Sequence, residues 1–211
     1  MKAILIFVLA FGLTATETHA MFFGNWIEQK FSLFSSNKWT QSRQGVRVIS
    51  DGSVSLLWTR LPASDSSAVT AKWNWSVDNS VPPTTLSKKG GDDRNLALYF
   101  VFVPPEVAEK NRNSNIRKLL KVNDARILMY VWGGNYARGD IVPSPYLGMR
   151  GKTIILRSAG TGEFGESVNL AADYKRAFGE PKTVLVGLAV SSDSDDTKTM
   201  VRARLQDLRI E

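Results

Sequence analysis

The sequence contains no cysteine and a single histidine, His19, among its 211 residues. A chain without these residue types cannot form a Ser-His-Asp or Cys-His catalytic mechanism, nor the imidazole and thiolate sites that usually bind zinc. It also lacks the side chain whose ordinary pKa lies closest to neutrality. Because His19 lies in a segment that we expect to be removed, the remaining chemistry is that of carboxylates, amines, guanidinium groups, phenols and hydroxyls.

Long hydrophobic runs are also scarce, and the one that stands out lies at the N-terminus. Lys2 precedes an apolar run over residues 3–13, and Thr18 and Ala20 provide the small residues of a cleavage site. This pattern predicts a signal peptide over residues 1–20, with an uncleaved anchor as the alternative. The run is short for a bilayer, and no later stretch is apolar enough to span one. We therefore expect one exported domain, residues 21–211, periplasmic or secreted, and not membrane-spanning.

The formal net charge of the chain is +7, from 27 basic and 20 acidic residues. A basic protein outside the cytoplasm could attract lipopolysaccharide, acidic polysaccharide or phospholipid. The alternative is that the scattered lysines and arginines serve solubility. Export argues against nucleic acid as a partner, and the sequence has no glycine-rich phosphate loop or dinucleotide fingerprint that would indicate a nucleotide.

Most of the chain alternates between apolar and polar residues, which is typical of strands with one buried and one wet face. The alternation shifts phase near Gln206 and Asp207, which predicts a β-bulge. The fold class that we expect is all-β, an antiparallel β-sandwich of the jelly-roll or galactose-binding-like kind with one or two short helices. The predicted strands are residues 46–49, 54–58, 69–78, 96–103, 126–132, 152–157, 183–190 and 201–210.

Two segments depart from this alternation. Residues 104–124 predict one or two short helices or a structured insertion, and residues 169–178 predict a short helix that ends at Gly179 and Pro181. The basic residues of the first segment suggest either a solvated face or a contact surface. The latter would suit a scaffold or adaptor of the cell envelope.

Two loops are rich in aspartate. Asp92 and Asp93 follow two glycines, and Asp193, Asp195 and Asp196 lie between the last two predicted strands. Calcium takes six to eight oxygen ligands, so these five residues are candidate ligands for a calcium ion. The alternatives are that they cap turns by accepting backbone hydrogen bonds, or that two of them form the carboxylate pair of a glycosidase.

Aromatic residues follow the predicted strand at 126–132. Trp132, Tyr136 and Tyr146 are candidate ligand-binding residues, since aromatic rings at loop mouths can stack on sugar rings. Trp132 shares a strand face with Tyr130, which also fits a place in the core. Trp73 and Trp75 alternate with polar residues, so we expect both in the core.

With these residues identified, the chain resembles the exported bacterial proteins of domain-of-unknown-function family 3047 over residues 61–210. The family carries no assigned activity, but the resemblance implies a β-sandwich akin to carbohydrate-binding jelly rolls. Asp173, within one of the matching blocks, is a further candidate ligand-binding residue. Two positions depart from the family pattern, because Ala97 replaces a frequent arginine and Ser167-Val168 replaces basic residues. The matching blocks are Trp73-Asn74-Trp75, Gly91-Asp92-Asp93, Tyr130-Val131-Trp132-Gly133, residues 169–179 and residues 193–197.

The function that these observations favour is a non-catalytic module that binds a glycan or an anionic cell-envelope component, with calcium as the candidate cofactor. The alternative is a polysaccharide-active enzyme that uses paired aspartates. These hypotheses differ in their geometric requirements, and all depend on whether the two acidic loops meet in space.

Overall fold

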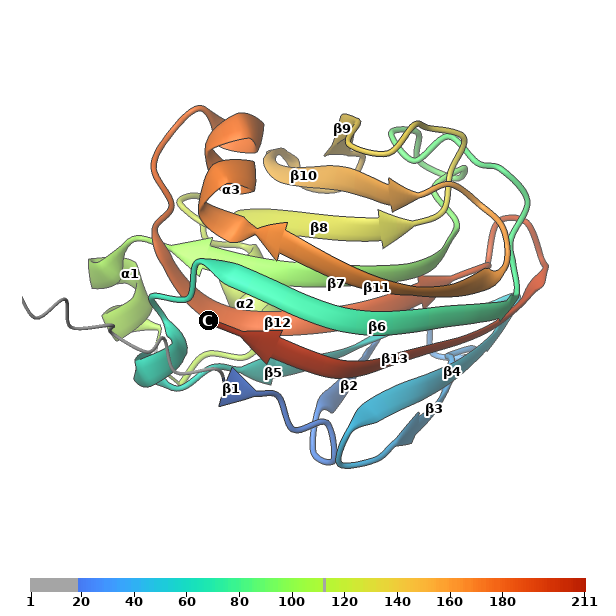
Figure 1. Ribbon diagram of the computed structural model, residues 1–211, viewed down its shortest axis with the longest axis horizontal. Helices are drawn as coiled ribbons and strands as arrows, with labels where there is room; N and C mark the ends of the chain where they lie inside the picture. The colour runs from blue at the N-terminus through green and yellow to red at the C-terminus, as the bar shows by residue number, and fades with distance from the viewer. Residues whose placement is uncertain (1–18, 112) are drawn as a thin grey trace, which may run out of the picture.

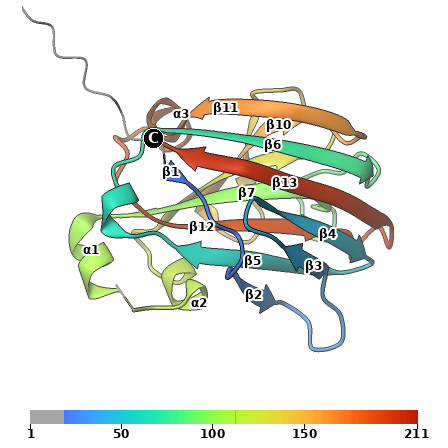
Figure 2. The same cartoon turned by 60° about the horizontal axis from the view of Figure 1, so that its bottom comes forward.

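The computed structural model describes residues 19–111 and 113–211, and two β-sheets packed face to face dominate it (Figure 1). In the first sheet the strand order is β11-β6-β13-β4-β3, with β1 added beside β13. In the second sheet the order is β2-β5-β12-β7-β8-β10-β9. The predicted β-sandwich is therefore confirmed, and Figure 2 shows the two layers from the side of β2 and β3.

The strands of the first sheet are β1 (His19–Ala20), β3 (Lys38–Gln41), β4 (Gly45–Asp51), β6 (Thr70–Asn79), β11 (Gly162–Asn169) and β13 (Met200–Ile210). Those of the second are β2 (Ile27–Lys30), β5 (Val54–Arg60), β7 (Arg94–Val103), β8 (Arg126–Trp132), β9 (Ile141–Ser144), β10 (Gly148–Arg157) and β12 (Val184–Asp193). The helices are α1 (Pro105–Lys110), α2 (Ile116–Leu120), α3 (Leu170–Phe178) and the 3₁₀ turn η1 (Ala63–Asp65).

The first sheet has one buried and one exposed face, as its alternating sequence predicts. In β13, Val201, Ala203 and Leu205 are buried against the second sheet. The predicted bulge is present, because the pairing of β13 with β6 shifts register between Gln206 and Arg209, and Asp207 adopts a φ of 56°. This bulge keeps Leu208 and Ile210 in the core after the change of phase.

Aromatic side chains fill the space between the sheets. Trp73 and Trp75 of β6 are buried there, as expected, against Tyr130 and Trp132 of β8. The ring centroids of the two cross-sheet pairs lie 5.7 and 5.5 Å apart. Such pairs add to the stabilisation that the buried area provides.

The second sheet is buried on both faces, and this changes the orientation expected for β5. Alternation suggests that its apolar residues face the core and its serines face water. In the structure Ser55 and Leu57 are buried toward the first sheet, while Leu56 and Trp58 join a second apolar cluster on the outer face. Ser55 is accommodated because its hydroxyl donates to Glu28 and accepts from the Trp39 indole N–H.

The pairing is antiparallel throughout both sheets except between β8 and β10, which run parallel. A parallel pair needs a crossover connection rather than a hairpin. Residues 133–147 provide it and place β9 at the edge of the sheet, antiparallel to β10. Turn and strand signals along the sequence do not encode this crossover.

The short helices predicted at 104–124 and 169–178 are present. Helix α3 begins where the Asn169 side chain accepts a hydrogen bond from the Ala172 N–H, and it ends at Gly179 in the left-handed conformation. Helices α1 and α2 belong to a connection that folds over the outer face of the second sheet. Ile116 and Leu119 of α2 are buried there, and Arg60 of β5 donates to two carbonyls of the connection.

The predicted signal peptide, residues 1–20, falls largely outside the described residues. Among the helices that the structure does describe, none has the length and hydropathy needed to cross a bilayer.

Candidate functional site

A pocket of about 380 Å³ opens on the outer face of the second sheet. Its floor is apolar and includes Leu56 of β5, Val101 of β7, Met129 of β8 and Ala189 of β12. The walls come from segments that lie over the sheet: Phe31 after β2, Leu86 before β7, Ile116 of α2, and Pro145 to Leu147 between β9 and β10. The connection between β7 and β8 thus contributes to a pocket wall through Ile116.

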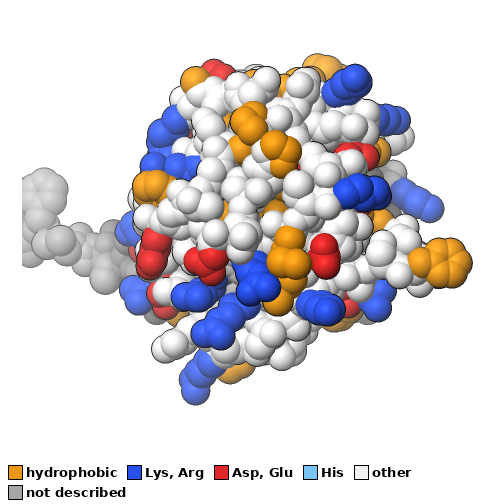
Figure 3. Space-filling model, turned by 90° about the vertical axis from the view of Figure 1, so that its right-hand side faces the viewer, with side chains coloured by type: hydrophobic (Ala, Val, Ile, Leu, Met, Phe, Trp, Pro, Cys, Tyr) orange, Lys and Arg blue, Asp and Glu red, His pale blue; other side chains and the backbone are white. Residues whose placement is uncertain are grey.

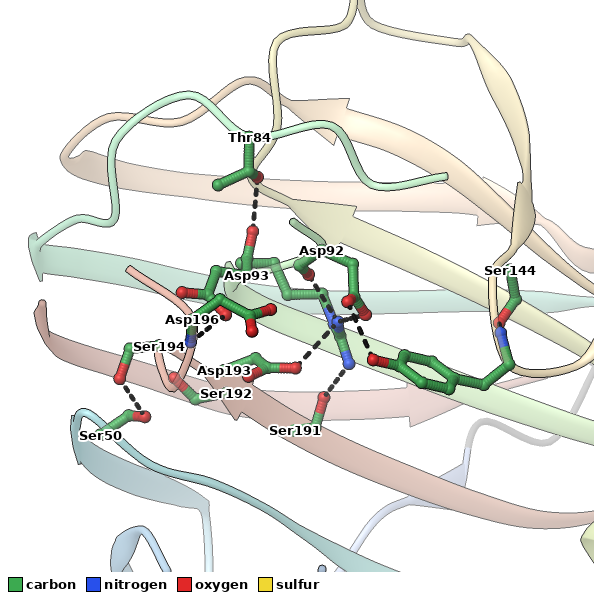
Figure 4. A network of polar contacts seen from close by, with 12 residues as sticks. Ser50, Thr84, Asp92, Asp93, Ser144, Ser191, Ser192, Asp193, Ser194 and Asp196 are labelled. Carbon is green, nitrogen blue, oxygen red and sulfur yellow. Dashed lines mark hydrogen bonds and ion pairs between the residues drawn. The ribbon is translucent and has the colours of Figure 1, made fainter. Parts of the chain in front are cut away.

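One end of the pocket is polar and is organised by Arg94, at the start of β7. Its Nη1 lies 3.3 Å from Oδ2 of Asp92 and 3.2 Å from Oδ2 of Asp193. Its Nη2 donates to the Tyr99 hydroxyl at 2.9 Å, and that hydroxyl lies 2.9 Å from Oγ of Ser191. Figure 4 shows Asp92, Ser191 and Asp193 gathered at this end. The antiparallel register of β7 and β12 pairs Arg94 with Asp193 directly, so the sheet itself holds these groups together.

Burial and neighbouring charges shift the pKa values of Asp193 and Arg94 at this end of the pocket. Burial raises the pKa of Asp193 to about 8, since Asp195 and Asp93 add to that effect and the Arg94 charge offsets only part of it. Burial alone would lower the pKa of Arg94, but Tyr99, Asp193 and Asp92 outweigh it and raise the pKa above its usual range. The guanidinium therefore stays charged, while Asp193 gains a proton far more readily than an ordinary aspartate.

The two acidic loops meet at this end of the sandwich. Oδ2 of Asp93 accepts hydrogen bonds from the backbone N–H and the hydroxyl of Thr197, at 2.7 and 2.6 Å. Oδ1 of Asp93 accepts one from the N–H of Asp196 at 3.3 Å. Asp93 therefore caps the turn of the second loop, as one alternative expected, and at the same time joins the two loops.

Of the five candidate metal ligands, the structure brings three together. Carboxylate oxygens of Asp93, Asp193 and Asp195 lie within 4.8 Å of one another. Asp92 instead pairs with Arg94, and Asp196 is exposed beside the cluster. Burial first, and then Asp195, Asp93 and Asp92, raise the pKa of Asp196.

Two of the aromatic candidates lie near the pocket. Tyr146 is 63% exposed at its rim, and its hydroxyl donates to Oδ1 of Asp92 at 3.3 Å. Burial of the hydroxyl, together with the Asp92 charge, raises the pKa of Tyr146. Tyr136 packs, half-buried, on the outer apolar cluster with its hydroxyl 3.3 Å from Ser87, and it does not line the pocket.

The other two candidates lie away from the pocket. Trp132 is 1% exposed in the core between the sheets, where its ring contacts Trp75 and Phe164, so it presents no ring face to a ligand. Asp173 accepts hydrogen bonds from the Tyr130 hydroxyl at 2.8 Å and from Arg176 at 2.9 Å. The bond from Tyr130 attaches α3 to β8, whereas the pair with Arg176 lies within α3 itself. Neither Trp132 nor Asp173 lines the pocket.

A family model described as "Protein of unknown function (DUF3047)" matches residues 24–209. The chain belongs to this family. The family resemblance inferred from the sequence blocks is therefore confirmed, and it extends to both acidic loops and to all the strands of the second sheet. A search of curated proteins finds no match.

Three solved structures have a similar course of the chain. The xyloglucanase domain of NopAA from Sinorhizobium fredii, solved with cellobiose, matches with a TM-score of 0.38 and 8% identity, over 92% of this chain and 98% of that one. A loop-swap mutant of Xyn11A from Necallimastix patriciarum matches with a TM-score of 0.38 and 11% identity, over 88% of this chain and 99% of that one. An endo-1,4-β-xylanase from Trichoderma reesei matches with a TM-score of 0.40 and 13% identity, over 85% of this chain and 96% of that one. At these TM-scores the likeness is loose.

Sequence patterns did not single out Arg94, Tyr99 or Ser191, which complete the polar end of the pocket. The available signal was an arginine directly after the Asp92-Asp93 pair, at the start of a strand. Gly133 belongs to the same arrangement, because a Cβ at this position would lie 2.8 Å from Cβ of Arg94. The DUF3047 chain thus brings the end of β8 close against Arg94.

Proposed function

We propose that this DUF3047 protein is exported and binds a neutral glycan, or another hydroxyl-rich component of the cell envelope, in the pocket on the outer face of the second sheet. The observation that supports this most strongly is the combination of an apolar floor with a polar end of fixed carboxylates and phenol hydroxyls. Sugars present both kinds of surface, since their C–H faces pack on apolar and aromatic groups and their hydroxyls donate to acceptors.

The charge at the polar end supports a neutral ligand over the anionic class that the sequence also suggested. Asp92, Asp193 and Asp195 line the pocket, and Arg94 is the cation among its lining residues. In the cation-free protein, a ligand that carried a phosphate or carboxylate into this end would meet like charges, which costs free energy. The chain as a whole carries a net charge of +7, but the pocket lining does not share this positive charge. A neutral glycan therefore fits the pocket better than an anionic one.

Binding is favoured over catalysis by the pairing of the carboxylates. A glycosidase needs one carboxyl group that protonates the leaving oxygen and a second that attacks or activates water. Here Asp92 and Asp193 each pair with the same Arg94 guanidinium, and Asp93 is held by Thr197. Asp92 and Asp193, which line the pocket, are thereby held in fixed positions for hydrogen bonds to a ligand.

Isothermal titration calorimetry of the full chain against neutral and acidic oligosaccharides tests this proposal. We expect a neutral oligosaccharide to bind, and Tyr146→Ala to weaken its affinity by about tenfold, or 1.4 kcal/mol. Phe34→Ala is the matched control, because Phe34 is 97% exposed and does not line the pocket. Binding only of acidic glycans, equal loss in both variants, or release of shortened sugars during titration would overturn the proposal.

Export is tested separately, by mass spectrometry of the protein isolated from its native cell. We expect an N-terminus at Met21. A chain that retains residues 1–20 in the cytoplasm would contradict this part of the proposal.

A further inference from the structure

The acidic cluster at the end of the pocket concentrates negative charge in a basic protein. Asp93, Asp193 and Asp195 meet there, with Asp92 and Asp196 beside them. The nearby positive groups are Arg94, which pairs with Asp92 and Asp193, and Lys198, which acts on Asp196. Carboxylates gathered in this way repel one another unless protons or a cation neutralise them.

The hydrogen bonds of the cluster leave one buried oxygen without a partner. Both oxygens of Asp93 accept hydrogen bonds from the second loop, and Oδ2 of Asp193 pairs with Arg94. Oδ1 of Asp193 is buried and has no hydrogen-bond partner, on a side chain that is only 10% exposed. Leaving a buried carboxylate oxygen unsatisfied is unfavourable, so the site calls for an additional group.

We propose that Asp93, Asp193 and Asp195 bind one divalent cation of the calcium type at the end of the pocket. Calcium suits this donor set, because it prefers carboxylate oxygens and tolerates irregular geometry. Three carboxylates supply part of its six to eight oxygens, and water completes the shell on the side where Asp195 is half-buried and Asp196 is exposed. Figure 3 shows this end of the sandwich, where acidic side chains reach the surface among basic and hydrophobic ones.

The cation has a definite place relative to the pocket. Asp193 and Asp195 both line it, so an ion bound between them lies at its polar end. It would join the loop before β7 to the loop after β12, which Asp93 already connects. Cation binding at this place requires only the three carboxylates, whichever ligand the pocket binds.

The test is calorimetric titration of the chelator-treated full chain with calcium chloride, followed by thermal unfolding. We expect one calcium per chain. At roughly 100-fold excess over the dissociation constant, we expect the melting temperature to rise by about 5 °C. Asp195→Asn should weaken calcium binding by about tenfold or more without loss of the fold, since Asp195 is half-buried and lies outside the Arg94 ion pairs. Asp78→Asn, an exposed aspartate of β6, is the control and should bind as the wild type does.

Three results would overturn the proposal. The first is no calcium binding at millimolar concentrations, in which case a proton shared between Asp193 and Asp195 satisfies the cluster. The second is calcium binding that survives both Asp195→Asn and Asp193→Asn, which places the ion elsewhere. The third is equal affinity for magnesium and calcium together with equal loss in Asp78→Asn, which indicates general charge screening. Loss of glycan binding with calcium binding intact contradicts the proposed function and leaves the cation site supported.

Discussion

The two faces of the seven-stranded sheet differ in what covers them. The inner face packs against the whole first sheet, and large aromatic residues fill the space between. Helices α1 and α2, the loops after β2 and before β7, and the segment between β8 and β10 cover the outer face, and between them they leave the pocket. Neighbouring residues on one strand therefore lie in different environments. Those on the inner face pack in the core and stabilise the fold, and those on the outer face leave room for a ligand.

The largest effect on the free energy of unfolding is expected at Arg94, in the polar end of the outer face. Arg94→Met leaves the buried carboxylates of Asp92 and Asp193 without their partner, so we expect the free energy of unfolding to fall by about 4 kcal/mol. Urea denaturation measures it. Adding Asp193→Asn to Arg94→Met removes one unpaired charge and should recover part of the loss. No recovery would show that Arg94 acts through packing rather than charge.

A matched pair of substitutions compares the two faces directly. Leu128 and Met129 are adjacent on β8; the first is buried between the sheets and the second lines the pocket. We expect Leu128→Ala to cost about 3 kcal/mol of unfolding free energy and Met129→Ala about 2 kcal/mol, since the pocket already limits packing around Met129. Equal losses in urea denaturation would contradict the distinction between a sealed and an open face.

The pH dependence of stability should report on Asp193 when calcium is removed. Its pKa in the folded protein is about 8, above its value in an unfolded chain, so the folded state holds a proton that the unfolded state releases. Stability therefore falls as the pH rises from about 5.5 to 8, by about 3 kcal/mol. Asp193→Asn should flatten this slope in chelator. The shortage of histidine helps the measurement, because few other groups titrate in this range. A slope that persists in the variant would assign it to another group.

The smallest expected effect concerns the capping of the second acidic loop. Thr197→Val removes the hydroxyl donor to Asp93 and keeps the backbone N–H bond, so we expect a loss of about 1 kcal/mol. Thr40→Val, on the exposed side of β3, should leave stability unchanged. If the two variants behave alike in thermal unfolding, Asp93 joins the loops through the backbone bonds alone.

The sequence predicted the strands whose residues alternate clearly, such as β6 and β13, and even the bulge at Asp207. It did not predict β11, because Gly162, Gly165 and Glu166 have low strand propensity, and pairing with β6 imposes the strand conformation. The short edge strands β2, β3 and β9 carry too few residues for a period to be recognised. Local signals also did not distinguish the two buried faces, which is why Leu56 and Ser55 point opposite to the expected directions.

For the candidate site, the sequence identified the residue type but not the network. The sequence marked the aspartates of both loops as candidates but left open whether the loops meet, and the structure brings them together. Arg94 and Tyr99 were missed, because their importance depends on the register between β7 and β12, strands far apart in the sequence. Trp132 was included because it ends a strand near a glycine turn, and only the packing of the two sheets shows that its ring is enclosed.

The bond between Asp93 and Thr197 joins residues 104 positions apart, and this has a kinetic consequence. Contacts of such long sequence separation are costly to close, and they tend to form late in folding. A cation or ligand that needs both loops would then find its site only after β12 has docked beside β7. We therefore expect the bound cation or ligand to slow unfolding and to leave the folding rate almost unchanged. The site would then increase the kinetic stability of the folded sandwich without speeding its formation.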